Sequence, residues 1–326
     1  MLIRTTGTES FSLGQSWAEV SDLWDKRLVF VTGKGGVGKT TLAAAIGVAA
    51  ARRGKRTVVC EVSDQERLPG LFGVGAAGGE EQELAPGLAG VTVDPERTKE
   101  EWLRYQLRSA TLAGVLGQSR VFQYLTAAAP GLTELVTMGK IWDLAQLERR
   151  TEGGVYDLAV VDAPATGHGV ALLRAPSTYA GLARVGPIRR QALIIDEFVR
   201  DPAATGVVAA ALPEEIPVTE TMDLERRLEE ELGLTLDAIV VNAVNPRRFS
   251  AGESRALGHT GGGSPEARAA IEAALSEHAR ARTEHAQVRR LRRAARGPVH
   301  TLPHLFEPEI GRPELERLAG ELERRL

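Results

Sequence analysis

Short apolar runs alternate along the chain with longer stretches in which apolar residues recur at helical spacing. The runs are typical of buried strands, and the longer stretches are typical of amphipathic helices. Strands are predicted at 28–32, 56–62, 91–93, 155–162, 207–212, 236–242 and 299–302. Helices are predicted at 16–24, 40–53, 218–232, 265–296 and 313–326, and a long loop is predicted at 68–90.

The order of these elements predicts the fold. Strand, helix and strand follow one another from 28 to 62, which implies a parallel sheet with right-handed crossovers. We therefore predict an α/β fold with a doubly wound, mostly parallel sheet in one domain over 27–326, preceded by an N-terminal extension with a short helix at 1–26. Helical patterns at about 96–150 and 174–206 predict insertions that form a small helical subdomain.

The first predicted strand runs directly into a glycine-rich turn. Gly33 is followed after four residues by Gly38, Lys39 and Thr40, which is the spacing of a phosphate-binding loop (P-loop). Glycines let backbone N–H groups converge on an oxyanion, and the following helix adds the positive end of its dipole. Lys39 supplies charge for the β- and γ-phosphates. The predicted nucleotide-binding set is Gly35, Gly36, Val37, Gly38, Lys39, Thr40 and Thr41.

A P-loop also needs a carboxylate at the end of a neighbouring strand to hold Mg²⁺. Asp162 follows the apolar run Leu-Ala-Val-Val and is the candidate, together with the Thr40 hydroxyl. Thr166, Gly167 and Gly169 are expected to form a loop whose backbone N–H groups report on a γ-phosphate. His168 has no second histidine or cysteine at ligand spacing, so it stays unassigned.

Composition narrows the function classes. The 326 residues are 43% hydrophobic with a net charge of −3, so the chain lacks the basic surplus of a nucleic-acid binder and no nucleic-acid partner is expected. Cys60 is the only cysteine, which fits a cytoplasmic protein. The longest apolar run, Leu42 to Ala51, is shorter than the ~20 residues of a membrane span. Membrane contact is therefore expected to be peripheral or through a partner.

Two stretches resemble a known family. The P-loop Lys34-Gly-Gly-Val-Gly-Lys-Thr40, with a lysine after its first glycine, resembles the deviant Walker A motif of a large ATPase group. The stretch from Asp162 through His168 to Pro176 is similar to that of the arsenical-pump and tail-anchored-protein-targeting ATPases. Further similar stretches are Pro213 to Thr221, Ala238 to Asn242 and Leu302 to Ile310.

The resemblance implies a dimeric ATPase with ATP and Mg²⁺ as ligands. Lys34 would reach across the dimer to the partner's phosphates and stabilise charge in the transition state. Asn242 would read adenine, because one amide offers both a donor and an acceptor. Glu214 is a further candidate for nucleotide contact. The implied catalytic residues are Lys34, Lys39, Asp162 and the acid considered next.

The chain departs from the family where the second predicted strand ends. The family has an aspartate there that orients the attacking water, and the equivalent stretch here runs from Glu61 to Phe72. Its register places Ser63 at the aspartate position and Asp64 beside it, so Asp64 either takes over the role or is a surface turn residue. The family's zinc-binding and arsenite-binding cysteines are absent, and with only three methionines the chain lacks a methionine-rich groove for a membrane segment.

Two functions of different class follow. The first is a dimeric ATPase whose nucleotide state rearranges helical elements that bind a protein client. The second is a nucleotide-dependent scaffold with little or no turnover, as one subunit of a heterodimer with a paralogue. The divergence around Ser63 motivates the second reading. A DNA-partition ATPase is disfavoured, because the stretches around Asp162 and Asn242 match the other branch.

Overall fold

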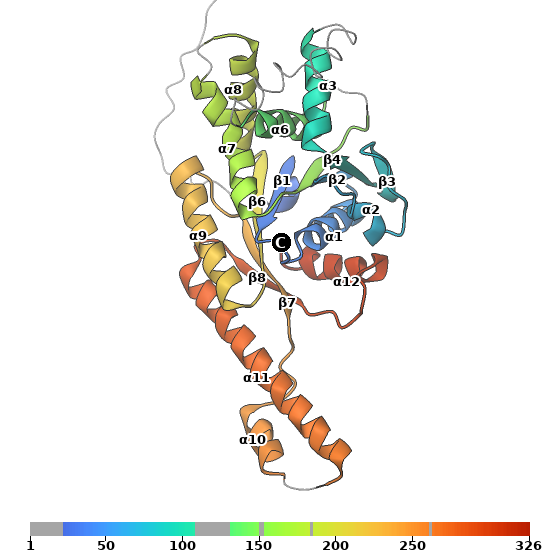
Figure 1. The fold of residues 1–326 in the computed structure, drawn as a ribbon, viewed down its shortest axis with the longest axis vertical. Coiled ribbons are helices and arrows are strands. Elements are labelled where there is room, and N and C mark those ends of the chain that lie inside the picture. The colour runs from blue at the N-terminus through green and yellow to red at the C-terminus, as the bar shows by residue number, and fades with distance from the viewer. Residues whose placement is uncertain (1–21, 108–130, 150–152, 183–184, 261–262) are drawn as a thin grey trace, which may run out of the picture.

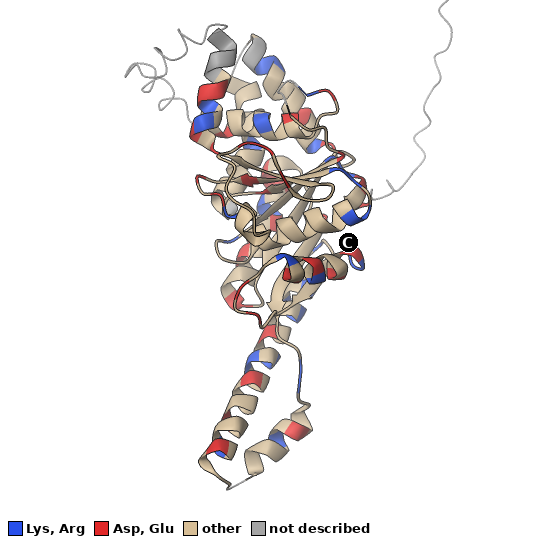
Figure 2. Ribbon diagram, turned by 90° about the vertical axis from the view of Figure 1, so that its right-hand side faces the viewer, with Lys and Arg blue, Asp and Glu red and all other residues tan. Residues whose placement is uncertain are grey.

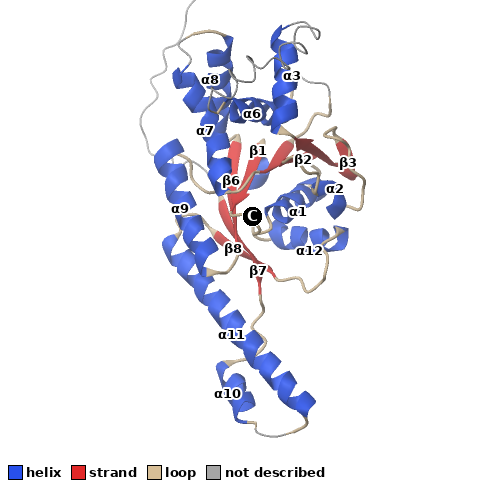
Figure 3. Cartoon of the chain, viewed as in Figure 1, coloured by secondary structure: helices blue, strands red, loops and turns tan. Residues whose placement is uncertain are grey.

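The computed structural model describes residues 22–107, 131–149, 153–182, 185–260 and 263–326. Their strands form one eight-stranded sheet in the order β3-β4-β2-β5-β1-β6-β7-β8 (Figures 1 and 3). Neighbours are parallel except β3 and β4, which are antiparallel. This confirms the predicted doubly wound, mostly parallel α/β sheet. The strands are β1 (Leu28–Gly33), β2 (Thr57–Val62), β3 (Gln82–Ala85), β4 (Leu88–Val93), β5 (Leu158–Asp162), β6 (Thr205–Ala211), β7 (Ala238–Val244) and β8 (Val299–Pro303).

Helices cover both faces of the sheet. One face packs against α1 (Lys39–Arg52) and α12 (Arg312–Glu323). The other face packs against α6 (Leu132–Leu144), α7 (Thr166–Leu182), α8 (Pro187–Arg200), α9 (Glu215–Leu232) and α11 (Pro265–Ala294). Strands covered on both faces bury every side chain, and this explains why they appear in the sequence as continuous apolar runs.

The central strand β1 positions the glycine-rich turn. Val29 and Val31 belong to the core under α1, whereas Leu28 and Phe30 belong to the opposite core. β1 lies between β5 and β6, where the strand order reverses. Ligands of such sheets bind outside the carboxyl ends of the strands at this reversal. The turn that follows β1 therefore leaves the sheet at the expected place for a ligand.

Small side chains bring α1 close to the sheet. The helix buries a run of alanines from Ala43 to Ala50 interrupted by Ile46, Gly47 and Val48. A Cβ atom on Gly47 would lie only 2.5 Å from Cγ2 of Val59 on β2. Packing of this kind fixes the position of the first turn of α1, and thus of the turn before it, relative to the strand ends.

Helices gather at one end of the molecule, at the top of Figure 1. They are α3 (Pro95–Leu107) with α6, α7 and α8. A small core of its own, made by Leu135, Ala175, Ala180 and Ala192, joins α6, α7 and α8. These helices form the predicted small helical subdomain. Residues 108–130, into which the first insertion helix was predicted to continue, lie outside the described residues.

A helical hairpin extends from the opposite end. It consists of α10 (Ala251–His259), which the sequence analysis did not predict, and the outer half of α11 (Figure 1). Ser250 and Glu253 form a capping box at the start of α10. Acidic and basic positions are interspersed along the hairpin in Figure 2, and Arg248 pairs with Glu277 of α11 at 2.7 Å.

Two predictions about the elements need correction or fall outside the structure. The predicted loop at 68–90 contains α2 (Leu68–Leu71), the edge strand β3 and the start of β4. β3 is short and polar, so it lacks the apolar alternation by which strands are recognised. The predicted helix 16–24 lies mostly outside the described residues, and within them η1 (Leu23–Asp25) is a 3₁₀ helix.

Candidate functional site

The glycine-rich turn has the backbone of a P-loop. Gly36 and Gly38 have φ angles of 84° and 89°, which side chains other than glycine rarely adopt. Gly33 packs against β6, where a Cβ atom would lie 2.3 Å from the carbonyl oxygen of Ala210. Gly38 precedes the first residue of α1, so the first N–H groups of that helix have no partner within it. The turn therefore presents backbone donors and a positive helix end to an anion.

Lys39 is half-buried at the start of α1. Its ammonium group donates a hydrogen bond to the carbonyl oxygen of Lys34 at 3.1 Å, so the side chain folds back over its own loop. Burial lowers the pKa of Lys39, the charge of Asp162 raises it, and the charge of Arg67 lowers it. A partly desolvated ammonium inside a ring of backbone donors is suited to bind a polyphosphate.

Asp162 and Thr40 meet beneath the loop. The Thr40 hydroxyl donates to Asp162 Oδ2 at 2.5 Å, across the ends of α1 and β5. Asp162 is only 7% exposed, and its Oδ1 atom is buried without a hydrogen-bond partner among the described residues. Burial raises the pKa of this carboxyl group, although Thr40 and Lys39 oppose the shift.

An orphaned carboxylate oxygen beside a hydroxyl offers the hard oxygen donors that Mg²⁺ prefers. The residues present thus fit a magnesium ion carried with a nucleotide, held through Thr40 and Asp162. The described residues contain no cluster of three or more histidine, cysteine or acidic side chains that could form a separate metal site.

Asn242 lies against the loop rather than away from it. Its Nδ2 donates to the carbonyl oxygen of Val37 at 3.1 Å, and its Oδ1 accepts from the backbone of Ala243 at 2.9 Å. Ala243 has a φ of 55°. A Cβ atom on Gly38 would lie 2.4 Å from Asn242 Nδ2. The amide therefore braces the loop through contacts that the sequence could not indicate.

Lys34 pairs within its own chain. Its Nζ lies 2.9 Å from Oε1 of Glu220 on α9, and both side chains are 40% exposed. Glu214 is the N-cap residue of the same helix and is exposed, with no side-chain capping bond. The remaining predicted P-loop residues differ in exposure: Gly35 and Gly36 are exposed, Thr41 is half-buried on α1, and Val37 is buried in the core with only its backbone available.

The end of β2 holds an acid, Glu61, that the sequence analysis did not assign to the site. Glu61 is 2% exposed and accepts hydrogen bonds from the backbone N–H groups of Arg67 (2.9 Å) and Leu68 (3.0 Å). Ser63 accepts from the backbone of Gln65 at 3.0 Å. Asp64 is exposed. A charged residue within a buried apolar strand was the available signal for Glu61.

The stretch after Asp162 is a helix and not the predicted loop. α7 begins at Thr166, so Gly167 and Gly169 lie in its first turn and Pro176 lies inside it. A Cβ atom on Gly169 would lie 2.8 Å from Oγ1 of Thr32 on β1, which shows that this glycine serves close packing. His168 is exposed in the first turn. The backbone N–H groups of His168 and Gly169 donate to the carbonyl oxygen of Ala165 (2.9 and 3.2 Å), so within the described residues only those of Thr166 and Gly167 remain as donors near Asp162.

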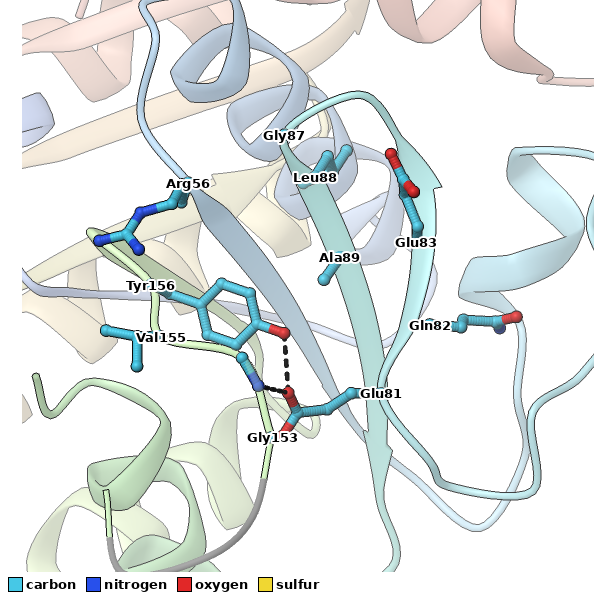
Figure 4. Close-up of a pocket in the computed structure, with 11 residues that line it drawn as sticks. Arg56, Glu81, Gln82, Glu83, Gly87, Leu88, Ala89, Gly153, Val155 and Tyr156 are labelled. Carbon is cyan, nitrogen blue, oxygen red and sulfur yellow. Dashed lines mark hydrogen bonds between the residues drawn. The ribbon is translucent and has the colours of Figure 1, made fainter. Parts of the chain in front are cut away.

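Away from the P-loop, a pocket of about 460 Å³ lies at the amino ends of the strands (Figure 4). It is lined by residues that precede β2, β4 and β5, which are the amino ends of these strands. Glu81 accepts hydrogen bonds there from Tyr156 (2.7 Å), Gly154 (2.9 Å) and both terminal nitrogens of Arg149. This buried network fastens the end of the helical insertion to the β3 edge.

Comparison with known proteins agrees with this geometry. The model of the anion-transporting ATPase family matches residues 26–193, which include the P-loop, Asp162 and α7. ATPase BagA of Mycobacterium tuberculosis is 28% identical over 246 residues, which cover 74% of this chain and 71% of that protein. The arsenical pump-driving ATPase of Escherichia coli is 27% identical over 252 residues, which cover 70% of this chain and 41% of that protein.

Proposed function

The chain belongs to the anion-transporting ATPase family, and from this premise we propose that it is a Mg²⁺-dependent, dimeric ATPase of the cytoplasm. Its nucleotide state would rearrange the helical elements to bind or release a partner protein. The observation that carries the proposal is the Thr40–Asp162 pair at 2.5 Å beneath a P-loop with its lysine in place.

The ground-state contacts explain how ATP would be held. The backbone donors from Gly35 to Thr40 and the ammonium of Lys39 would surround the phosphates. Thr40 and Asp162 would hold the magnesium ion, which supplies positive charge to the phosphoryl oxygens. Within one chain Lys39 donates to the Lys34 carbonyl, and a phosphate would replace that acceptor.

Hydrolysis would depend on a second chain. Lys34 is paired with Glu220 in the single chain, and exposed ion pairs of this kind contribute about 0.2–1 kcal/mol, so little energy holds the lysine. We propose that Lys34 leaves Glu220 and reaches the phosphates bound to a second copy or a paralogue. A cation placed there stabilises charge that develops in the transition state.

The link between β5 and α7 supports the coupling to a client. Asp162 ends β5, and α7 begins four residues later and packs against α6 and α8. Movement of the first turn of α7 with the γ-phosphate would therefore pass along a continuous helix into the helical subdomain. The client is proposed to bind these helices.

One observation favours a slower alternative. Neither Ser63 nor Asp64 makes a side-chain hydrogen bond to the P-loop residues among the described residues, and Asp64 is exposed. A site without a water-positioning acid turns over slowly. In that case the protein would act as a nucleotide-dependent scaffold, alone or with a paralogue.

Measuring Mg-ATP turnover of the purified chain over a range of protein concentrations tests the proposal. We expect turnover per chain to rise with concentration, because the active species is a dimer. Lys39→Ala should lose nucleotide binding. Lys34→Ala should keep binding and lose turnover.

Three outcomes would contradict parts of this scheme. A turnover rate that Lys39→Ala leaves unchanged would come from a contaminant and overturn the ATPase assignment. Full activity in Lys34→Ala would remove the role across the dimer. Tight ATP binding without turnover at any concentration would favour the scaffold.

A further inference from the structure

The segment between β2 and α2 is held rigidly from both sides. Glu61 receives the backbone N–H groups of Arg67 and Leu68, as described above. The neighbouring Glu66 accepts from the backbone of Ala77 at 2.8 Å and of Gly79 at 2.7 Å. Glu61 therefore fixes the backbone on both sides of the Arg67 Cα atom, and Glu66 ties the preceding residue to the turn at 77–79, an arrangement typical of a side chain that must be positioned.

This anchored backbone lies next to the magnesium-site residues. In the sheet register Glu61 of β2 pairs with Asp162 of β5, so their side chains leave the same face. Asp162 in turn contacts Thr40 at 2.5 Å. The backbone of Arg67 is therefore held by the residue that lies beside Asp162 in the sheet.

The Arg67 side chain is available for a ligand. The residue is exposed, and among the described residues its guanidinium makes a single hydrogen bond, to Gln65 Oε1 at 3.2 Å. Arg67 thus offers an exposed guanidinium on a backbone that Glu61, the sheet neighbour of Asp162, holds in place.

We propose that Arg67 is a further catalytic residue, an arginine supplied by the same chain that contacts the terminal phosphate of the bound nucleotide, and that Glu61 is its positioning residue. This inference rests on the proposed function. The planar guanidinium suits two phosphate oxygens at once, and its fixed charge would stabilise the transition state alongside Lys34. The guanidinium would leave Gln65 to reach this phosphate.

The test compares binding with turnover in Arg67→Gln, with Arg67→Lys as the conservative variant. Displacement of a fluorescent nucleotide gives the affinities for ADP and for a non-hydrolysable ATP analogue. We expect Arg67→Gln to change ADP affinity by no more than about twofold and to weaken the analogue about tenfold. We expect kcat to fall about 10²-fold, as when one donor to developing charge is removed, with partial recovery in Arg67→Lys.

Variants of Glu61 test its positioning role separately. Glu61→Gln keeps an acceptor for both backbone N–H groups, whereas Glu61→Ala removes it. We expect Glu61→Ala to lower kcat and to weaken the ATP analogue more than ADP, in the same direction as Arg67→Gln, and Glu61→Gln to restore most of both losses. Equal kcat in both variants and the wild type would show that Glu61 only stabilises the fold. Arg226→Gln, an exposed arginine on α9, is the matched control for the loss of a surface charge.

The outcomes separate this inference from the proposed function. If the wild type shows no turnover, the ATPase proposal fails, but the affinity ratio of ADP to analogue still tests Arg67. If the wild type turns over and Arg67→Gln matches it in both rate and affinity ratio, Arg67 is a surface arginine and only this inference fails.

Discussion

Replacing Asp162 by asparagine should stabilise the empty protein and remove its response to magnesium. The carboxylate is buried, and Oδ1 lacks a hydrogen-bond partner among the described residues. Burial raises its pKa, so the folded chain binds this proton more tightly than the unfolded chain does. The contribution of the group to stability is therefore largest at acidic pH and is lost as pH rises through the folded pKa. At neutral pH the ionised group destabilises the fold.

The expected gain in stability follows from the buried Oδ1 atom of Asp162, which has no hydrogen-bond partner among the described residues. A buried polar atom without a partner costs about 1–3 kcal/mol, and the neutral amide of similar shape removes part of this. We expect Asp162→Asn to gain about 1 kcal/mol at pH 7, which is about 2 °C in the unfolding temperature. For the wild type, nucleotide with Mg²⁺ at one hundred times Kd should add about 2.7 kcal/mol.

Thermal unfolding followed by circular dichroism measures both quantities. Each variant is heated alone, with ATP and EDTA, and with ATP and Mg²⁺, at pH 7 and again at pH 5. In Asp162→Asn the Mg²⁺ sample should unfold at the same temperature as the EDTA sample. Its advantage over the wild type without ligand should shrink at pH 5, because the wild-type carboxylate is then closer to its protonated form.

A control and a contrary result complete this test. Asp223→Asn changes an exposed aspartate on α9, so it should alter neither the empty protein nor the Mg²⁺ response. If Asp162→Asn instead keeps the wild-type difference between Mg²⁺ and EDTA, then Asp162 does not hold the metal. A destabilised empty variant would show that the Thr40 hydrogen bond outweighs the burial of charge.

Two further predictions concern the P-loop and the hydrogen-bond network of Glu81 at the amino ends of the strands. Gly38→Ala should weaken nucleotide binding at least about tenfold and lower stability by about 1–3 kcal/mol, because its φ of 89° is strained for alanine and the new Cβ would lie 2.4 Å from Asn242 Nδ2. Nucleotide titration measures the affinity and thermal unfolding measures the stability, and unchanged values would contradict the loop geometry. Arg149→Met should destabilise by about 3–5 kcal/mol in urea unfolding, because the Arg149 side chain is 3% exposed and its removal leaves the buried Asp143 and the partly buried Glu81 without this cation. A change below about 1 kcal/mol would show that the hydrogen bonds from Tyr156 and Gly154 satisfy Glu81.

The buried strands and the P-loop could be predicted because they depend on local sequence. β1 extends over Leu28–Gly33 where the apolar run predicted a strand at 28–32, and α1 begins at Lys39. Strands that are buried on both faces consist of continuous apolar runs, so they can be recognised in a single sequence. The P-loop spacing likewise lies within a few residues. Features that depend on neighbouring residues could therefore be predicted from the sequence.

The errors arose where long-range packing decides local structure. Thr166, Gly167 and Gly169 were predicted to form a loop, and glycines are poor helix formers, yet α7 begins at Thr166 and runs through both glycines. Contact with β1 favours the helix there, since Gly169 fits closely against Thr32. The strand β3 was missed because an edge strand with an exposed side needs no apolar alternation.

Contacts between distant segments were also beyond the sequence. Glu220 lies 186 residues from Lys34, and the sequence predicted only that it belongs to a helix at 218–232. Glu61 was read as part of a strand whose end matched the family poorly. Its role as the acceptor for the backbone of Arg67 depends on the turn that brings the chain back to β2. Pairing of this kind becomes visible only once the fold is known.

In the single chain, both lysines of the P-loop already have partners, and these partners link nucleotide binding to dimerisation. Lys39 donates to the carbonyl of Lys34, and the ammonium of Lys34 pairs with Glu220 on α9. In the proposed dimer, a bound phosphate would compete for Lys39 and thereby loosen the loop that carries Lys34, while a second chain would compete with Glu220 for the Lys34 side chain. Nucleotide and partner would therefore act on one short segment. Such coupling is reciprocal, so dimerisation would tighten ATP binding by the same factor by which ATP tightens dimerisation. Substituting Glu220 should then raise both affinities together, and a change in only one of them would show that the two events are independent.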